Sequence, residues 1–161
     1  MTQTFVLRLL QPYEANTKKR LAKTPKIFIR DSGLFHALLG IESFDELYGQ
    51  PVFGASWEGV VVESIVPRLK PTVQASFFRI SSGDEIDLVL QKAGQTIAIE
   101  CKASKSPELT KGNHRAKEII DPAKAFIVAP VDGAYSLGND WQVMEIEGIL
   151  QSLAKLGWLR Y

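Results

Sequence analysis

The sequence predicts an α/β protein, a sandwich in which helices cover both faces of a mixed sheet. Apolar residues recur at helical spacing over residues 56–70. They then alternate with a period of two through three successive runs, 74–80, 85–91 and 96–102. A helical stretch over 107–120 and a continuous apolar run follow. A meander of strands that continues through a helical crossover requires antiparallel and parallel pairing in one sheet.

Length and composition favour one globular domain. The chain has 161 residues, of which 45% are hydrophobic, and this is enough to bury a core. Its 19 basic and 18 acidic residues give a net charge of +1, so nucleic-acid binding would need local basic patches. Because the sequence shows neither a membrane-spanning apolar run nor a secretion signal, we expect a soluble, cytoplasmic protein.

The side chains available for metal binding are mainly carboxylates. Cys101 is the single cysteine and the chain has two histidines. These numbers exclude an internal disulfide, a cysteine-rich zinc site and a histidine-rich metal centre. A metal bound here would therefore be a hard cation such as magnesium, manganese or calcium.

The N-terminal residues predict an arm that is separate from the main domain. Residues 1–10 form either a strand or the end of a helix. Residues 11–25, with basic side chains and two prolines, predict an exposed connection, for which we favour a solvated linker over a phosphate-contacting arm. The expected division is an arm at 1–25 and a domain at 26–161, whose core spans about 56–130.

A short strand and two short helices come next. Residues 26–31 read KIFIRD and predict a buried strand. Asp31 or Ser32 can cap a helix that carries leucines on one side. Residues 42–55 predict a second helical piece and a turn.

The remaining elements complete the sandwich. Ser56 is expected to cap the long helix, which Pro67 should kink or end. Residues 125–130 are typical of an interior strand and 141–146 of a further strand. Residues 147–157 predict a closing amphipathic helix, and its inward side chains are Ile149, Leu150, Leu153 and Leu156.

The strand at 96–102 has an apolar face and a polar face. Side chains alternate along a strand, so Glu100 and Lys102 project opposite to Ile97, Ile99 and Cys101. The same rule places Asp87 with Val89, opposite to Ile86, Leu88 and Leu90. If the two strands pair through the turn at Gly94, Asp87 lies beside Glu100 and Lys102 on one face.

This combination of charges suits hydrolysis of a phosphodiester. Two neighbouring carboxylates repel each other and favour a divalent cation that neutralises both. An ammonium group beside them can stabilise the negative charge that grows on the phosphoryl oxygens. Glu58 and Glu63 on the preceding helix are too far apart around its axis to share a face. We choose Glu58 for the site and rank Glu63 second.

The order Glu58, Asp87, Glu100-x-Lys102 resembles the PD-(D/E)XK nuclease superfamily. More narrowly, the stretches PKIFIRDSGL, WEGVVVE, GDEIDLVL and AIECKAS resemble the C-terminal domain of a family of prokaryotic AAA-type ATPases. In that family the domain follows an ATPase and a winged-helix module. The resemblance implies an αβββαβ restriction-endonuclease-like sandwich, preceded here by a small helical N-terminal segment.

The resemblance also implies roles for the site residues. Asp87, Glu100 and the backbone carbonyl of Cys101 would bind Mg²⁺ or Mn²⁺, and Glu58 would complete the shell directly or through water. Lys102 would position the attacking water and stabilise the transition state. The implied substrate is DNA, and the implied partner is an ATPase module in the same or a neighbouring chain.

The other polar residues receive simpler interpretations. Asp84 and Glu85 are expected to be solvated turn residues, Cys101 a small core residue, and His36 a packing residue of its helix. A basic cluster downstream either contacts a phosphate backbone or forms an ordinary wet helix face. Its members are Lys105, Lys111, His114, Arg115 and Lys117.

Three functional hypotheses follow from the sequence. The first is a divalent-metal-dependent phosphodiesterase domain acting on DNA. The second is a module of the same fold without turnover, which binds DNA or a partner and serves an associated ATPase. The third is a self-associating structural domain, a homo-oligomer with a large apolar interface. The chain has no P-loop and no dinucleotide-binding motif, so none of these includes ATP hydrolysis by this chain.

Overall fold

The computed structural model describes residues 6–13, 21, 23–138 and 140–160. Its strands are β1 Leu7–Pro12, β2 Lys26–Ile29, β3 Gln74–Arg79, β4 Glu85–Lys92, β5 Gln95–Cys101, β6 Lys124–Val128, β7 Tyr135–Leu137 and β8 Trp141–Met144. Its helices are α1 Ser32–Leu38, α2 Phe44–Tyr48, α3 Phe53–Ile65, α4 Lys111–Ile120 and α5 Ile146–Lys155. Within these ranges, every helix is too short or too polar to cross a membrane.

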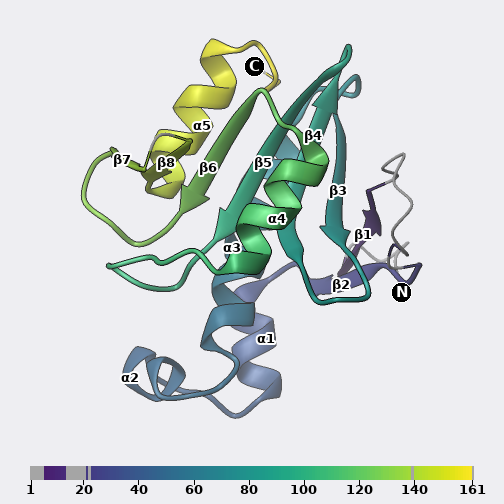
Figure 1. Cartoon of the computed structure of the whole chain (residues 1–161). Coiled ribbons are helices and arrows are strands. Elements are labelled where there is room, and N and C mark those ends of the chain that lie inside the picture. Colours follow the sequence, from purple (N-terminus) through teal and green to yellow (C-terminus); the bar gives the residue numbers. More distant parts are fainter. Residues whose placement is uncertain (1–5, 14–20, 22, 139, 161) are drawn as a thin grey trace.

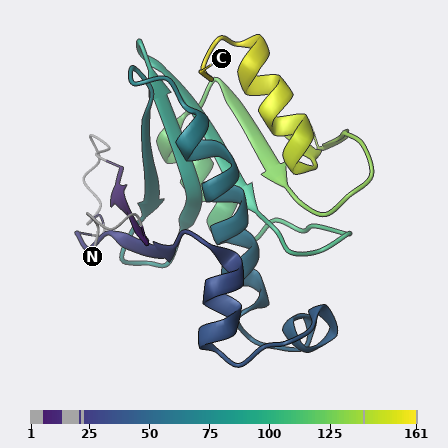
Figure 2. The same ribbon diagram turned by 180° about the vertical axis from the view of Figure 1, so that it is seen from behind.

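The strands form one mixed sheet in the order β2-β1-β3-β4-β5-β6-β8-β7. The predicted meander of β3, β4 and β5 is antiparallel, and β5 pairs in parallel with β6 after the crossover helix α4. Figure 1 shows α4 on one face of the sheet, and Figure 2 shows α3 and α5 on the other. A mixed sheet with helices on both faces is therefore confirmed. The edge strand β7 was not predicted.

The start of the described chain is part of this sheet. β1 lies between β2 and β3, so the strand alternative for this segment is confirmed. The predicted exposed connection is wrong at Gln11 and Pro12, which end β1, and at Leu21, which bridges to Ile80 and packs against the core. Residues 14–20 and 22 lie outside the described residues, and the division at residue 25 stays a prediction.

The segment from β2 to α2 is more exposed than predicted. β2 is an edge strand in which Phe28 is buried but Ile27 is 63% exposed. Asp31 caps α1, as predicted, and its side chain accepts a hydrogen bond from the Leu34 backbone N–H. No residue of α1 is buried. Both short helices project beyond the end of the sheet (Figures 1 and 2).

Helix α3 begins three residues before the predicted cap. Its N-cap is Val52, and Ser56 is a buried residue within the helix. The Ser56 hydroxyl lies 2.7 Å from Nε2 of His36, so this pair connects α3 to α1. The prediction that Ser56 caps the helix is therefore wrong. The effect of Pro67 is confirmed, because α3 ends at Ile65 and Pro67 lies in the 3₁₀ turn that follows.

The core consists of two apolar layers, one on each side of the sheet. The layer beneath α3 and α5 contains Ile97 and Ile99, and the layer beneath α4 contains Ala98. The predicted alternation along β5 is therefore confirmed, including the packing of Cys101 with the first layer. The inward position predicted for Leu156 is wrong, since this residue follows α5 as its C-cap and is 38% exposed.

Candidate functional site

A bulge in β4 determines where Asp87 points. Ser76 of β3 pairs with Val89 of β4, and Phe78 pairs with Ile86. Between these two pairs β3 advances by two residues and β4 by three, so β4 contains one extra residue. An extra residue of this kind re-aims the side chains beside it. As a result, Ile86 and Val89 both pack beneath α4, whereas Leu88 packs beneath α3. The predicted shared face of Asp87 and Val89 is therefore wrong, and the Asp87 carboxylate meets β2 and α3 instead.

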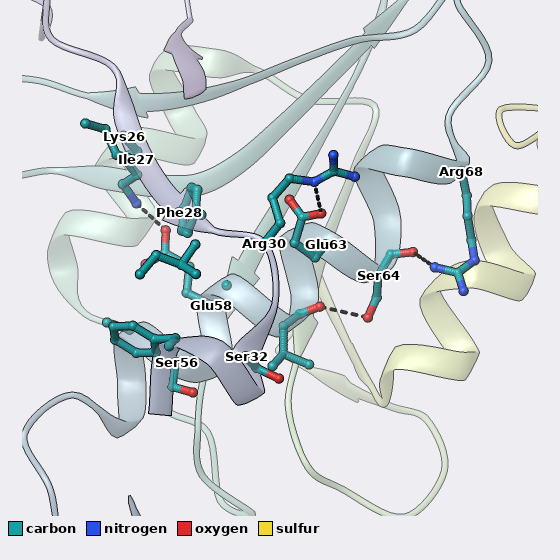
Figure 3. A pocket seen from close by; sticks show the side chains of 15 residues that line it. Lys26, Ile27, Phe28, Arg30, Ser32, Ser56, Glu58, Glu63, Ser64 and Arg68 are labelled. Carbon is teal, nitrogen blue, oxygen red and sulfur yellow. Dashed lines mark hydrogen bonds and ion pairs between the residues drawn. The ribbon is translucent and has the colours of Figure 1, made fainter. Parts of the chain in front are cut away.

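Lys26 connects the carboxylates on this side of the sheet. Its ammonium Nζ lies 2.6 Å from Oε1 of Glu58 and 3.1 Å from Oδ1 of Asp87. Oε1 of Glu85 lies 2.5 Å from the same nitrogen. Figure 3 shows Lys26 reaching from β2 to Glu58 on α3. Glu58 and Asp87 are therefore brought together, as predicted, but by a lysine that sequence reasoning did not place in the site.

Glu85 also belongs to this cluster, and its interpretation as a solvated turn residue is wrong. Besides Lys26, it accepts two hydrogen bonds from Arg79, each 2.7 Å long. The signal for Lys26 was its place in KIFI, where alternation puts it on the same face as the buried Phe28. A charged side chain on a buried face requires a partner of opposite charge.

Glu100 and Lys102 form an ion pair at the end of β5, with 2.9 Å between Oε1 of Glu100 and Nζ of Lys102. Glu100 is 5% exposed, and its second oxygen, Oε2, is buried without a hydrogen-bond partner in the described residues. The backbone N–H of Cys101, between these two residues, donates a 3.0 Å hydrogen bond to Oδ2 of Asp87. Asp87 is therefore fixed to the Glu100–Lys102 strand through the backbone.

Asn113 supports this part of the site and was also missed. It completes a capping box with Thr110 at the start of α4, a pairing that the spacing Thr-x-x-Asn could have indicated. Its Nδ2 donates to the backbone carbonyl of Glu85 at 3.1 Å, and its Oδ1 lies 3.5 Å from Nζ of Lys102. The buried Asn113 thus holds the N-terminus of α4 against β4, beside Lys102.

Burial disfavours the charged forms of two carboxyl groups in this site. Burial, followed by the charge of Asp87, raises the pKa of Glu58 to about 7. The same two causes, in the same order, raise the pKa of Glu100 to about 8. Although burial alone lowers it, the pKa of Lys26 is raised above its ordinary value by Asp87 and Glu58. Glu58 and Glu100 therefore hold their protons to a higher pH than exposed glutamates do.

A cavity of about 600 Å³ lies beside Glu58, between β2, α1 and α3 (Figure 3). Glu63 lines its other end and accepts hydrogen bonds from Arg8 of β1 and from Arg30, which follows β2; the bond from Arg30 is 3.0 Å long. These contacts make Glu63 a connection between the strands and α3. The choice of Glu58 over Glu63 for the site stays a prediction.

Glu63→Gln is expected to destabilise the fold by about 2 kcal/mol, because two partly buried guanidinium groups lose their charged acceptor. Urea unfolding measures this loss, and Glu108→Gln at an exposed position is the control. Unchanged stability would show that Glu63 does not hold the strands and α3 together.

The basic cluster is spread over different environments. Arg115 forms a bidentate ion pair with Asp84, whose side chain is 2% exposed, so the interpretation of Asp84 as a solvated turn residue is wrong. Lys117 pairs with Asp140 at 3.3 Å. The exposed members are Lys105, Lys111, His114 and Arg115. DNA contact by this cluster stays a prediction.

Comparison with known proteins identifies the family of this chain. A family described as a domain of unknown function, DUF4143, matches residues 53–149, and a second, DUF8612, matches residues 1–45. The uncharacterized proteins Rv2008c of Mycobacterium tuberculosis and Mb2031c of Mycobacterium bovis are each 33% identical over 150 residues, or 93% of this chain. The chain spans 34% of the length of these relatives. With more than half of its residues matched, the chain belongs to the DUF4143 family.

Proposed function

We propose that this domain is a divalent-metal-dependent phosphodiesterase that acts on DNA and has a restriction-endonuclease-like fold. The order α3, β3, β4, β5, α4, β6 supports the fold proposal, since it repeats the αβββαβ order of that sandwich. The resemblance of the sequence to the C-terminal domain of AAA-type ATPases supports a partner ATPase module. The length of the mycobacterial relatives leaves room for such a module in one chain.

The observation that carries the proposal is the buried Oε2 atom of Glu100, which has no hydrogen-bond partner in the described residues. A buried carboxylate oxygen without a partner is costly, and a metal ion is one group that can satisfy it. Asp87 is close enough for its charge to raise the pKa of Glu100. Two carboxylates and a backbone carbonyl are donors that Mg²⁺ and Mn²⁺ accept.

The donor set limits how a metal could be held. No three His, Cys, Asp or Glu side chains in the described part of the chain are grouped so that they could hold a metal ion. The proposed ligands are accordingly Asp87, Glu100 and the carbonyl of Cys101. Glu58 can join them only through water or after Lys26 has left, because Lys26 lies between Glu58 and Asp87.

Each residue has a role that follows from its charge and position. A bound metal would supply a Lewis acid for the phosphoryl oxygens. Lys102 would hold the attacking water and stabilise the negative charge that develops on the phosphate. Asn113 would limit the movement of Lys102, because it is buried and anchored to β4. Glu58, with a pKa of about 7, could exchange a proton with water near neutral pH.

A second candidate is a module of the same fold without turnover. The position of Lys26 favours it, since an ammonium group already contacts Glu58, Glu85 and Asp87. In this alternative Lys26 neutralises the carboxylates permanently, and the domain binds DNA or a protein partner through other surfaces. The two candidates differ in whether a divalent cation enters the site.

Wild-type protein is expected to nick supercoiled plasmid DNA in millimolar Mn²⁺ or Mg²⁺ and to stop when EDTA is added. Calorimetry with Mn²⁺, run beside the gel assay, separates the two candidates. Cleavage at the wild-type rate in Asp87→Asn would reject the metal-binding role proposed for Asp87. A folded wild-type domain that neither binds Mn²⁺ nor cuts DNA, but shifts DNA on a gel, is the non-catalytic module.

A further inference from the structure

Lys26 reaches the site from a separate part of the chain. It is 32 residues from Glu58 and 61 from Asp87 in sequence. Its side chain is 13% exposed, and its ammonium also lies 5.4 Å from the centre of the Phe77 ring. Three carboxylates and an aromatic ring around one nitrogen form a complete cation site, with Lys26 as its occupant.

The same contacts engage both oxygens of Asp87. Oδ1 faces Lys26, and Oδ2 accepts the hydrogen bond from Cys101. A metal that binds Oδ1 would therefore come within a few ångströms of the ammonium. Two cations at that distance repel each other strongly at the low dielectric constant of a buried site. A metal on Oδ1 would therefore compete with Lys26 for this oxygen.

Lys26 can leave the site without disrupting the sheet. β2 is an edge strand whose pairing with β1 uses backbone groups, among them those of the Leu10–Lys26 pair. The lysine side chain is a flexible chain of four methylene groups, so a change of rotamer can move its ammonium several ångströms. Lys26 also lines the cavity beside Glu58, so its side chain borders open space.

We propose that Lys26 is a built-in competitor for the divalent cation, which holds Glu58, Glu85 and Asp87 together until a metal displaces it. This inference rests on the metal site of the proposed function. A divalent ion is the stronger occupant because it brings a second positive charge to the carboxylates around Lys26. Lys26 thus sets the metal concentration at which the site loads.

Substitution of Lys26 should therefore have two opposite effects. Lys26→Met is expected to bind Mn²⁺ about tenfold more tightly than wild type, because no ammonium has to be displaced. The same variant should unfold at a lower temperature without metal, because the carboxylates lose their counter-ion. Calorimetry and thermal unfolding with and without Mn²⁺ measure the two effects. Lys92→Met is a matched control, since Lys92 binds the Gly157 carbonyl elsewhere on the sheet.

A second measurement uses wild-type protein and does not depend on the folding of a variant. Reductive methylation followed by mass spectrometry reports how accessible each lysine is. Saturating Mn²⁺ is expected to increase modification of Lys26 severalfold and to leave Lys92 unchanged. Modification of Lys26 that stays the same in metal-saturated protein would overturn the proposal, as would an Mn²⁺ affinity in Lys26→Met that equals or falls below that of wild type.

These outcomes separate the competitor from the proposed function. Suppose that Asp87→Asn loses Mn²⁺ binding but Lys26→Met binds Mn²⁺ with wild-type affinity. The proposed metal site is then supported, and the proposal that Lys26 competes with the metal is rejected. If Lys26→Met binds Mn²⁺ but wild type does not, Lys26 competes with the metal, as proposed. The wild-type domain would then have no metal-dependent turnover, because Lys26 keeps the metal out.

Discussion

Asp87→Asn and Lys102→Met are expected to abolish cleavage of DNA by two different routes. Asp87 connects the two halves of the site. Its side chain contacts Lys26 and the Cys101 backbone, and its charge raises the pKa of both Glu58 and Glu100. Its neutral amide replacement removes a metal ligand. We expect Mn²⁺ affinity to fall by a factor on the order of 10² and cleavage to fall with it.

Lys102→Met should leave metal binding intact. Lys102 is paired with Glu100 and is a cation, so its loss removes a positive charge near the metal position and does not remove a ligand. Mn²⁺ affinity should therefore stay equal or rise slightly. The cleavage rate at saturating metal should fall by about 10²–10³, the usual cost of losing one preorganised positive group in the transition state.

Single-turnover cleavage at saturating Mn²⁺ and calorimetric titration measure the two quantities separately. Lys155→Ala on the exposed end of α5 and Asp45→Asn on α2 are matched controls for charge. Circular dichroism shows whether each variant is folded. If both site variants cut DNA at the wild-type rate, the roles given to Asp87 and Lys102 are rejected.

The parts of the fold that depend on local periodicity could be predicted from the sequence. The strands of the meander lie within one residue of their predicted ends, because alternation and the turns at Gly83 and Gly94 determine them locally. The faces of β5 were also predicted correctly, because β5 pairs with β4 and β6 without a register shift. A period of two is reliable only where the pairing is regular.

Errors occurred where a long-range contact overrides the local pattern. The bulge in β4 cannot be seen in the alternation of EIDLVLQ, because it depends on how β4 pairs with β3. Ser56 has the composition of a helix cap, but its hydroxyl bonds to His36 of α1 and the helix continues past it. In both cases the tertiary partner decides between two locally acceptable structures.

The same limit applies to the candidate site. Alternation on β5 was enough to place Glu100 and Lys102 together, and both are paired in the structure. Lys26 was missed because its partners are 32 and 61 residues away. Asp84 was missed because its guanidinium partner, Arg115, lies on a helix that crosses the sheet. Charged residues next to apolar runs are therefore the positions where a hidden partner should be sought.

Glu100→Gln is expected to stabilise the metal-free protein at neutral pH. Glu100 is 5% exposed, with a pKa of about 8 in the folded protein against the ordinary value of 4.5 for a glutamate. Between these values the folded protein keeps a proton that the unfolded chain has lost. The free energy of unfolding therefore decreases as the pH rises from about 4.5 to 8. Each unit of pKa shift corresponds to about 1.4 kcal/mol, which sets the scale of the effect.

Replacement by glutamine removes this cost, because a neutral amide does not ionise. We expect a gain on the order of 2 kcal/mol at pH 7, which shrinks towards zero near pH 4.5. The groups that act on Glu100 are Asp87, Lys102 and Glu85, and of these Lys102 alone favours its charged form. Urea unfolding at pH 5, 7 and 8 measures the gain, with the exposed Glu108→Gln as control.

Mn²⁺ should reverse the order of stability. A metal binds the charged form of Glu100, so it should stabilise wild-type protein at pH 7 and have little effect on Glu100→Gln. Wild type would then gain stability with added Mn²⁺ until it approaches or exceeds the variant. A gain in Glu100→Gln that is the same at pH 5 and pH 8 would show that improved packing, and not a suppressed ionisation, stabilises the variant. The raised pKa of the buried carboxyl would then not be the origin of the gain.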